Sequence, residues 1–191
     1  MKTRLEPSPG SATETYVELS LGVDNWRWSG VPFSIRAGKA LAARATEVRV
    51  VFKRPPRLAF LDEPEHPAPN ELVLRIDPDP GLRLNMLSKK ASGRSAGNVH
   101  LDLSFAAELG KPPEPYERLL NDALTGDRSL FTRQDVVEET WRVIQPLVDH
   151  PPAPVQYARG SWGPAQHPGR TSWQLPWLTS PDQRSTDHGD T

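Results

Sequence analysis

The sequence contains no cysteine, and its 191 residues carry almost no net charge. The lack of cysteine excludes disulfide bonds, thiolate-ligated zinc and a thiol nucleophile, and it fits a reducing compartment, so the cytoplasm is the expected location. Lysine and arginine total 23 against 24 aspartates and glutamates, which gives a net charge of −1. Nucleic-acid-binding proteins usually show a clear basic excess. We therefore expect no nucleic-acid partner.

Long apolar runs and phosphate-cradling glycine motifs are also missing. The segment from Met1 to Pro7 has no apolar stretch typical of a secretory signal, and no run approaches the length of a membrane helix, so no membrane partner is expected. There is no Gly-x-Gly-x-x-Gly turn and no P-loop, which argues against a dinucleotide fold within these residues. None of the five histidines has an acidic partner at a diagnostic spacing. We expect no general base and no metal site here.

Strand patterns fill the first half of the chain and helix patterns follow. Short connections without intervening helices favour an antiparallel sheet. One helix is predicted to begin at Pro115 and end before Gly126, and a second to be capped by Thr132 and ended by Pro151. The prediction is an α+β fold, a large and mostly antiparallel sheet with helices packed on one face or end. The alternating segments are 13–23, 31–36, 46–52, 71–76, 81–87 and 99–105.

Polar and proline-rich segments set the expected domain limits. Residues 1–12 are interpreted as a disordered leader, and residues 165–191 as a disordered tail. A single domain is expected over residues 13–164, which is long enough for a hydrophobic core. Within it, loops are predicted at residues 54–70, which are rich in proline, and at residues 88–98.

Four cations surround the turn after the second predicted strand, and they form the candidate site. Arg36, Lys39, Arg44 and Arg49 follow one strand, a glycine-containing turn and the start of the next strand. One interpretation is a set of solvated surface charges. The other is an anion pocket, in which Lys39 supplies a point charge and an arginine supplies a planar fork for phosphate oxygens. The residues alone leave both interpretations open.

The tryptophans are mostly expected to be structural. Trp26 and Trp28 are predicted to share one face of an extended segment, where they either pack on the sheet or offer a surface for stacking a ring. Trp141 and Phe131 are expected in the core. Trp162 is expected to anchor its glycine-rich loop.

Seven separate segments, in the same order, resemble the C-terminal domain of glucose-6-phosphate dehydrogenases, from about residue 13 to about residue 164. The resemblance implies an α+β domain whose sheet also carries a dimer interface. It rests on residues 13–17, 24–33, 36–39, 70–78, 116–120, 126–133 and 160–164.

The family resemblance also implies a function. Members oxidise glucose 6-phosphate to the lactone and reduce NADP, at the start of the pentose phosphate pathway. Lys39 matches the substrate-binding lysine and Arg44 a second substrate-binding cation, with Arg36 and Arg49 as candidate supporting cations. The family's dinucleotide turn and catalytic histidine segment are not among these residues. No catalytic residue is therefore assigned, and no turnover is expected from these residues alone.

The expected partners are glucose 6-phosphate and either a second copy of the chain or the family's N-terminal domain. The alternative is a stand-alone module that binds a sugar phosphate or dimerises without enzyme activity.

Overall fold

The computed structural model describes residue 11 and residues 13–54, 69–110 and 113–164. The chain divides into two compact units, which are described separately. The first unit comprises Met1–Ala43 and Thr140–Thr191, and the second comprises Arg44–Glu139. The predicted tail, the predicted leader apart from residue 11, and most of the proline-rich loop lie outside the described residues.

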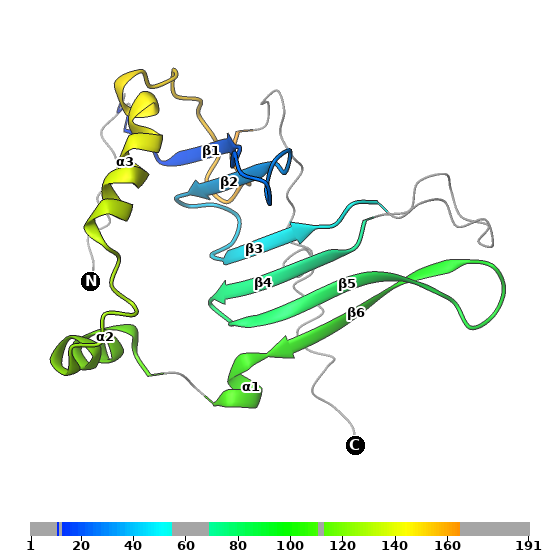
Figure 1. Ribbon diagram of the computed structural model, residues 1–191. Coiled ribbons are helices and arrows are strands. Elements are labelled where there is room, and N and C mark those ends of the chain that lie inside the picture. The colour runs from blue at the N-terminus through cyan, green and yellow to red at the C-terminus, as the bar shows by residue number, and fades with distance from the viewer. Residues whose placement is uncertain (1–10, 12, 55–68, 111–112, 165–191) are drawn as a thin grey trace. The chain divides into compact units, whose positions relative to one another are not determined.

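The first unit contains an antiparallel ribbon of two strands, β1 (Tyr16–Leu21) and β2 (Phe33–Gly38) (Figure 1). Tyr16 lies opposite Gly38 at one end, and Leu21 lies opposite Phe33 at the other. The alternation of apolar and polar residues along both strands explains the pairing, because alternate side chains of a strand point to opposite faces.

The second unit contains a four-stranded antiparallel sheet. Its strands are β3 (Thr46–Val51), β4 (Glu71–Asp77), β5 (Gly81–Lys89) and β6 (Ala96–Ser104), and they lie in chain order (Figure 1). All six predicted strands are therefore present and antiparallel, and they are divided between two sheets.

The two faces of the four-stranded sheet differ in chemistry. Val48, Leu74, Leu82 and Leu103 form one cross-strand row, and a similar apolar row lies beside it. This apolar face is only partly covered within the described residues, and Leu101 is 60% exposed. The opposite face carries ion pairs around Val73, which is fully buried.

Three helices complete the described part of the chain: α1 (Phe105–Leu109), α2 (Pro115–Thr125) and α3 (Gln134–Asp149). As predicted, α2 begins at Pro115 and ends before Gly126, which caps the helix with a left-handed φ of 75° that suits glycine. Helix α1 was not predicted, because five residues are too few for a periodic pattern. Ser104 caps α1 by accepting a hydrogen bond from the backbone N–H of Ala107. None of these helices is long and apolar enough to cross a membrane.

The structure corrects the start of α3 and the loop at residues 88–98. Helix α3 begins at Gln134, so Thr132 lies outside it, and the Arg133 carbonyl accepts the hydrogen bond from Val137 N–H.

Strands β5 and β6 extend well into the predicted loop. They leave a short turn, which is closed by a hydrogen bond of 3.0 Å from the Lys90 N–H to the Ser95 carbonyl. The alternation of apolar residues did not predict this extension, because polar residues can continue the backbone hydrogen bonding between two strands of a hairpin.

The tryptophan predictions were also wrong in two places. Residues 25–29 form a turn instead of an extended segment, because the Asn25 side chain accepts hydrogen bonds from the backbone N–H groups of Arg27 and Trp28. Trp26 is consequently 88% exposed, whereas the Trp28 ring meets the Phe33 ring edge-on at 5.5 Å. Trp141 is 59% exposed and Phe131 is 45% exposed, so neither is buried as expected.

Candidate anion-binding site

Lys39 follows directly after β2 and is held by its backbone. Its N–H donates to the Thr15 carbonyl at 2.8 Å, and its carbonyl accepts from the Tyr157 hydroxyl at 2.7 Å. The side chain is exposed, and within the described part of the chain no ion-pair or hydrogen-bond partner reaches its ammonium. The turn therefore fixes the base of Lys39 and leaves its charge available to an anion.

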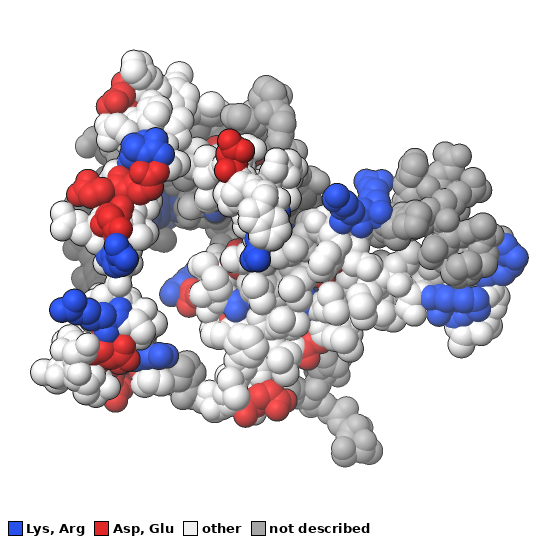
Figure 2. Space-filling model, in the orientation of Figure 1, with Lys and Arg blue, Asp and Glu red and all other residues white. Residues whose placement is uncertain are grey.

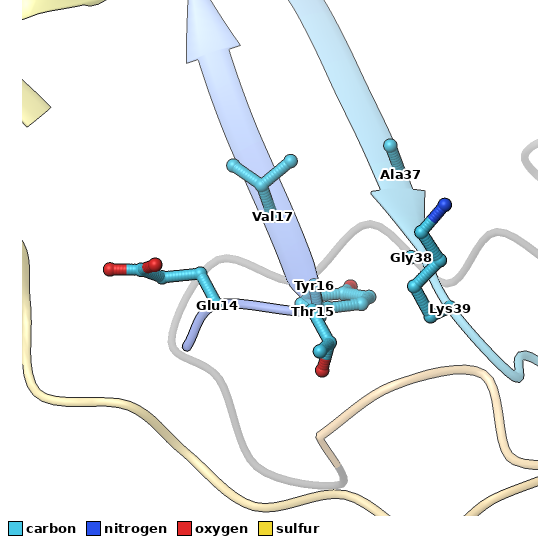
Figure 3. A pocket seen from close by; sticks show the side chains of 7 residues that line it. All are labelled: Glu14, Thr15, Tyr16, Val17, Ala37, Gly38 and Lys39. Carbon is cyan, nitrogen blue, oxygen red and sulfur yellow. The ribbon is translucent and has the colours of Figure 1, made fainter. Parts of the chain in front are cut away.

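An open depression of about 340 Å³ lies beside Lys39, at the ends of β1 and β2. It is lined by residues 14–17 and 37–39. Figure 3 shows the Lys39 amine lying near Ala37 along β2, and the Glu14 carboxylate pointing to the opposite side of β1. The carboxylate thus leaves the lysine charge uncompensated. The volume is at the small end of the range for ligand pockets.

The turn after Lys39 is conformationally strained. Ala40 has a φ of 50°, in the left-handed region that costs a residue with a Cβ roughly 1–2 kcal/mol. Two hydrogen bonds from the 157–163 loop hold the turn in this conformation. Gly160 N–H donates to the Ala40 carbonyl at 2.8 Å, and Ala42 N–H donates to the Ser161 carbonyl at 2.9 Å.

Aromatic contacts fix the same loop against the ribbon. The Tyr16 and Tyr157 rings lie 5.5 Å apart at 53°. A Cβ added to Gly163 would lie 2.5 Å from Tyr16 Cε2, and its φ is already +101°, so only glycine fits there. The Arg36 guanidinium lies 5.4 Å from the centre of the Trp162 ring, in agreement with the prediction that Trp162 anchors this loop.

Arg44 belongs to the other unit and has an acidic partner there. Its Nε lies 3.1 Å from Asp77 Oδ2, and the Arg44 side chain is 87% exposed. An ion pair this exposed contributes about 0–1 kcal/mol, so an incoming phosphate can compete for the guanidinium. Arg44 follows Lys39 by five positions in the sequence.

Arg49 is largely enclosed and has acidic partners. Its side chain is 15% exposed, and its guanidinium lies 3.1 Å from Glu47 and 3.9 Å from Glu71. Its charge is therefore compensated within the sheet. Arg36 likewise has its guanidinium against Trp162. Of these four predicted cations, Lys39 and Arg44 present their charges largely to solvent.

The strand-to-helix junction in the described part of the chain differs from the dinucleotide-binding motif of a strand, a glycine-rich turn and a helix. Strand β6 runs directly into α1 without a glycine-rich turn, and α1 has five residues. No group of three or more His, Cys, Asp or Glu suited to a metal ion occurs among the residues described. His100 lies in β6, as predicted. No hydride-transfer step is assigned to this part of the chain.

Basic side chains also gather within the second unit, at the tip of the β5–β6 hairpin. Lys89, Lys90 and Arg94 lie at this turn, and Figure 2 shows blue atoms there. Acidic and basic side chains lie side by side over α3 in the same view.

Sequence reasoning missed Tyr157. Its hydroxyl reaches Lys39 across 118 positions of the sequence, and no local pattern indicates such a contact. The glycines and the tryptophan of the neighbouring 160–164 segment are visible in the sequence, but they do not indicate the Tyr157 contact.

The fold and the site define an antiparallel α+β domain with a lysine on a turn after a strand. The chain belongs to the glucose-6-phosphate dehydrogenase family, whose C-terminal domain matches residues 2–171. This confirms the resemblance inferred from the seven segments.

The relatives and solved structures agree with this assignment. Glucose-6-phosphate 1-dehydrogenase 1 of Mycobacterium tuberculosis is 52% identical over 172 residues, covering 88% of this chain and 36% of the relative. The crystal structure of glucose-6-phosphate 1-dehydrogenase from Mycobacterium avium is 51% identical, with a TM-score of 0.75, and the match covers 90% of this chain and 37% of that one.

A second solved structure is described as glucose-6-phosphate dehydrogenase in complex with its substrate glucose-6-phosphate. It is 34% identical with a TM-score of 0.70, and the match covers 79% of this chain and 32% of that one. The present chain spans about a third of the length of the relatives it matches.

Proposed function

We propose that this chain provides the substrate-binding and dimerisation part of an NADP-dependent glucose-6-phosphate dehydrogenase. In this role it contributes to oxidation of glucose 6-phosphate to 6-phosphogluconolactone, the first step of the pentose phosphate pathway, in the cytoplasm. Membership of the family supports the reaction. The uncompensated ammonium of Lys39 is the observation that carries the substrate-binding role.

Lys39 would contact the phosphate of the substrate. A phosphate oxygen accepts a charge-assisted hydrogen bond from an ammonium, and such bonds contribute about 1.5–3 kcal/mol. Arg44 would add a planar fork after exchanging Asp77 for the phosphate. Neither side chain moves a proton or a hydride in this proposal. Their role is to hold the anionic end of the sugar.

The exposed apolar face of the four-stranded sheet supports the dimerisation role. Val48, Leu101 and Leu103 are each at least 41% exposed on this face. Adjacent exposed apolar side chains mark a surface that another protein part covers. We propose that a second copy of the chain, or the family's N-terminal domain, is that part.

The catalytic role needs residues that this sequence does not contain. A hydride acceptor site and a general base are required for dehydrogenation. We therefore expect a preparation of these 191 residues alone to form no NADPH from glucose 6-phosphate and NADP. NADPH formation above a heat-treated control would overturn this part of the proposal.

A stand-alone sugar-phosphate-binding or dimerisation module is the second candidate, and the open depression beside Lys39 is compatible with it. Calorimetry with glucose 6-phosphate, glucose and inorganic phosphate tests the binding role shared by both candidates. We expect glucose 6-phosphate to bind and glucose not to, because the phosphate carries the charge. Equal binding of the two sugars would contradict a phosphate site. Restoration of NADPH formation on mixing with a family N-terminal domain would favour the first candidate.

A further inference from the structure

The turn that carries Lys39 is held by a residue distant in sequence, and we propose that Tyr157 is a positioning residue for the Lys39 ammonium. The inference rests on the proposed function, in which Lys39 contacts the substrate phosphate. Tyr157 does not reach the ligand in this account. It acts through the backbone of Lys39, 118 positions earlier in the sequence.

The hydroxyl of Tyr157 lies among three oxygen atoms. Its oxygen is 2.7 Å from the Lys39 carbonyl, 3.1 Å from the Thr15 carbonyl and 3.2 Å from Thr15 Oγ1. A phenol has one hydrogen to donate, and the shortest contact assigns it to the Lys39 carbonyl. The Thr15 hydroxyl can in turn donate to the phenol oxygen. Both backbone polar groups of Lys39 are thus engaged, its N–H by Thr15 and its carbonyl by Tyr157.

This arrangement fixes the base of a flexible side chain. Lysine has a four-carbon stem, so the position of its ammonium depends on the direction in which the backbone presents it. Ala40, the next residue, has a positive φ that persists only while its surroundings hold it. Loss of the Tyr157 hydrogen bond would release one of the contacts that hold this turn. Lys39 would keep its charge but lose its preset direction.

Removal of the Tyr157 hydroxyl tests the proposal. Tyr157→Phe removes the hydroxyl and keeps the ring that contacts Tyr16. Tyr116→Phe is the matched control, because Tyr116 is 80% exposed and its hydroxyl has no hydrogen bond within the described residues. Amide hydrogen exchange of the chain without ligand reports on the turn, and calorimetry with glucose 6-phosphate reports on binding.

We expect Tyr157→Phe to raise the exchange rates of the Lys39 and Ala42 amides about 2- to 10-fold, the range for one hydrogen bond, and to weaken glucose 6-phosphate binding by a similar factor. The salt dependence of binding should stay that of the parent chain, because the Lys39 charge remains. Tyr116→Phe should change neither quantity. Thr15→Val, which removes the other hydroxyl of the group, should shift both in the same direction and serves if Tyr157→Phe does not fold.

Unchanged exchange at Lys39 and Ala42 in both Tyr157→Phe and Thr15→Val would overturn the positioning role. Faster exchange with unchanged affinity would also overturn it, since the contact would then be structural only. Lys39→Ala separates failure of the proposed function from failure of this inference. If Lys39→Ala binds glucose 6-phosphate like the parent, the substrate-binding role of Lys39 is wrong and the role of Tyr157 in binding fails with it. If Lys39→Ala loses binding, the exchange rates and affinities of Tyr157→Phe and Thr15→Val decide the inference.

Discussion

Asp102 in strand β6 holds two arginines on the charged face of the four-stranded sheet, and its removal should destabilise this unit strongly. Arg75 Nη2 donates to Asp102 Oδ1 at 2.6 Å, and Arg83 Nε donates to Asp102 Oδ2 at 2.6 Å. The Arg75 side chain is 13% exposed, that of Arg83 24% and that of Asp102 29%. The three groups are therefore only partly screened by water. Arg75 Nε is already buried without a hydrogen-bond partner within the described residues.

Asp102→Ala leaves both guanidinium groups partly buried without their carboxylate. A hydrogen bond to a charged group contributes about 1.5–3 kcal/mol, and breaking a buried ion pair from one side costs about 3–5 kcal/mol. Because these side chains are partly exposed and the two bonds are not additive, we expect a loss of about 2–4 kcal/mol in the free energy of unfolding. Asp102→Asn keeps one oxygen acceptor and should lose less.

Urea unfolding followed by circular dichroism measures this loss. The matched control is Asp135→Ala, since Asp135 also binds an arginine through both oxygens, at 3.0 and 2.7 Å from Arg133. The Asp135 side chain is 62% exposed and that of Arg133 80%, so the control should lose about 1 kcal/mol or less. Equal losses in Asp102→Ala and Asp135→Ala would refute the argument that burial, and not the number of contacts, sets the size of the effect.

Three further predictions concern other parts of the chain. Ala40→Gly should raise the free energy of unfolding by about 1 kcal/mol, because glycine adopts the left-handed φ of 50° without the Cβ clash, and a lower unfolding midpoint would contradict this. Val73→Ala should lower that free energy by about 2–3 kcal/mol, because Val73 is fully buried, and a loss below about 0.5 kcal/mol would contradict it. Hydrogen bonds from the backbone and side chain of Ser129 lower the pKa of Asp127 below its ordinary value of 3.8. This contribution to stability is present above the unfolded pKa and is lost as pH falls through the lower folded pKa, so NMR should show the carboxyl titrating below 3.8 and not above it.

The strands and the candidate lysine could be predicted because their signals are local. The alternation of apolar and polar residues along β4 and β5 indicates that one face of each strand is buried. The turn after Gly38 places Lys39 at the end of a strand. Pro115 and Gly126 mark the ends of α2 because each has a conformational preference that suits its position. The α+β class follows from these elements.

The contacts that organise the site could not be predicted because they join distant segments. At the site, Tyr157 reaches Lys39 and Thr15. In the four-stranded sheet, Asp102 links β6 to β4 through Arg75 and to β5 through Arg83. The sequence also gave no reason to separate Arg49, which is enclosed by carboxylates, from the exposed cations. Those distinctions depend on strand register and not on residue type.

The mispredicted turn at Trp26 has a local cause instead. Alternating tryptophans suit a strand, but the Asn25 side chain captures two backbone N–H groups and closes a turn. Such competition between side chain and backbone is decided by geometry within a few residues. The pattern of apolar positions does not report it.

The central claim is that the Lys39 ammonium binds the phosphate of glucose 6-phosphate, and calorimetry on a matched pair of variants tests it most directly. Lys39→Ala should weaken glucose 6-phosphate binding by about 10- to 150-fold, the range for one charge-assisted hydrogen bond. Lys53→Ala, which removes an exposed lysine just after β3, should bind like the parent chain. Equal affinities for the parent, Lys39→Ala and Lys53→Ala would contradict the account.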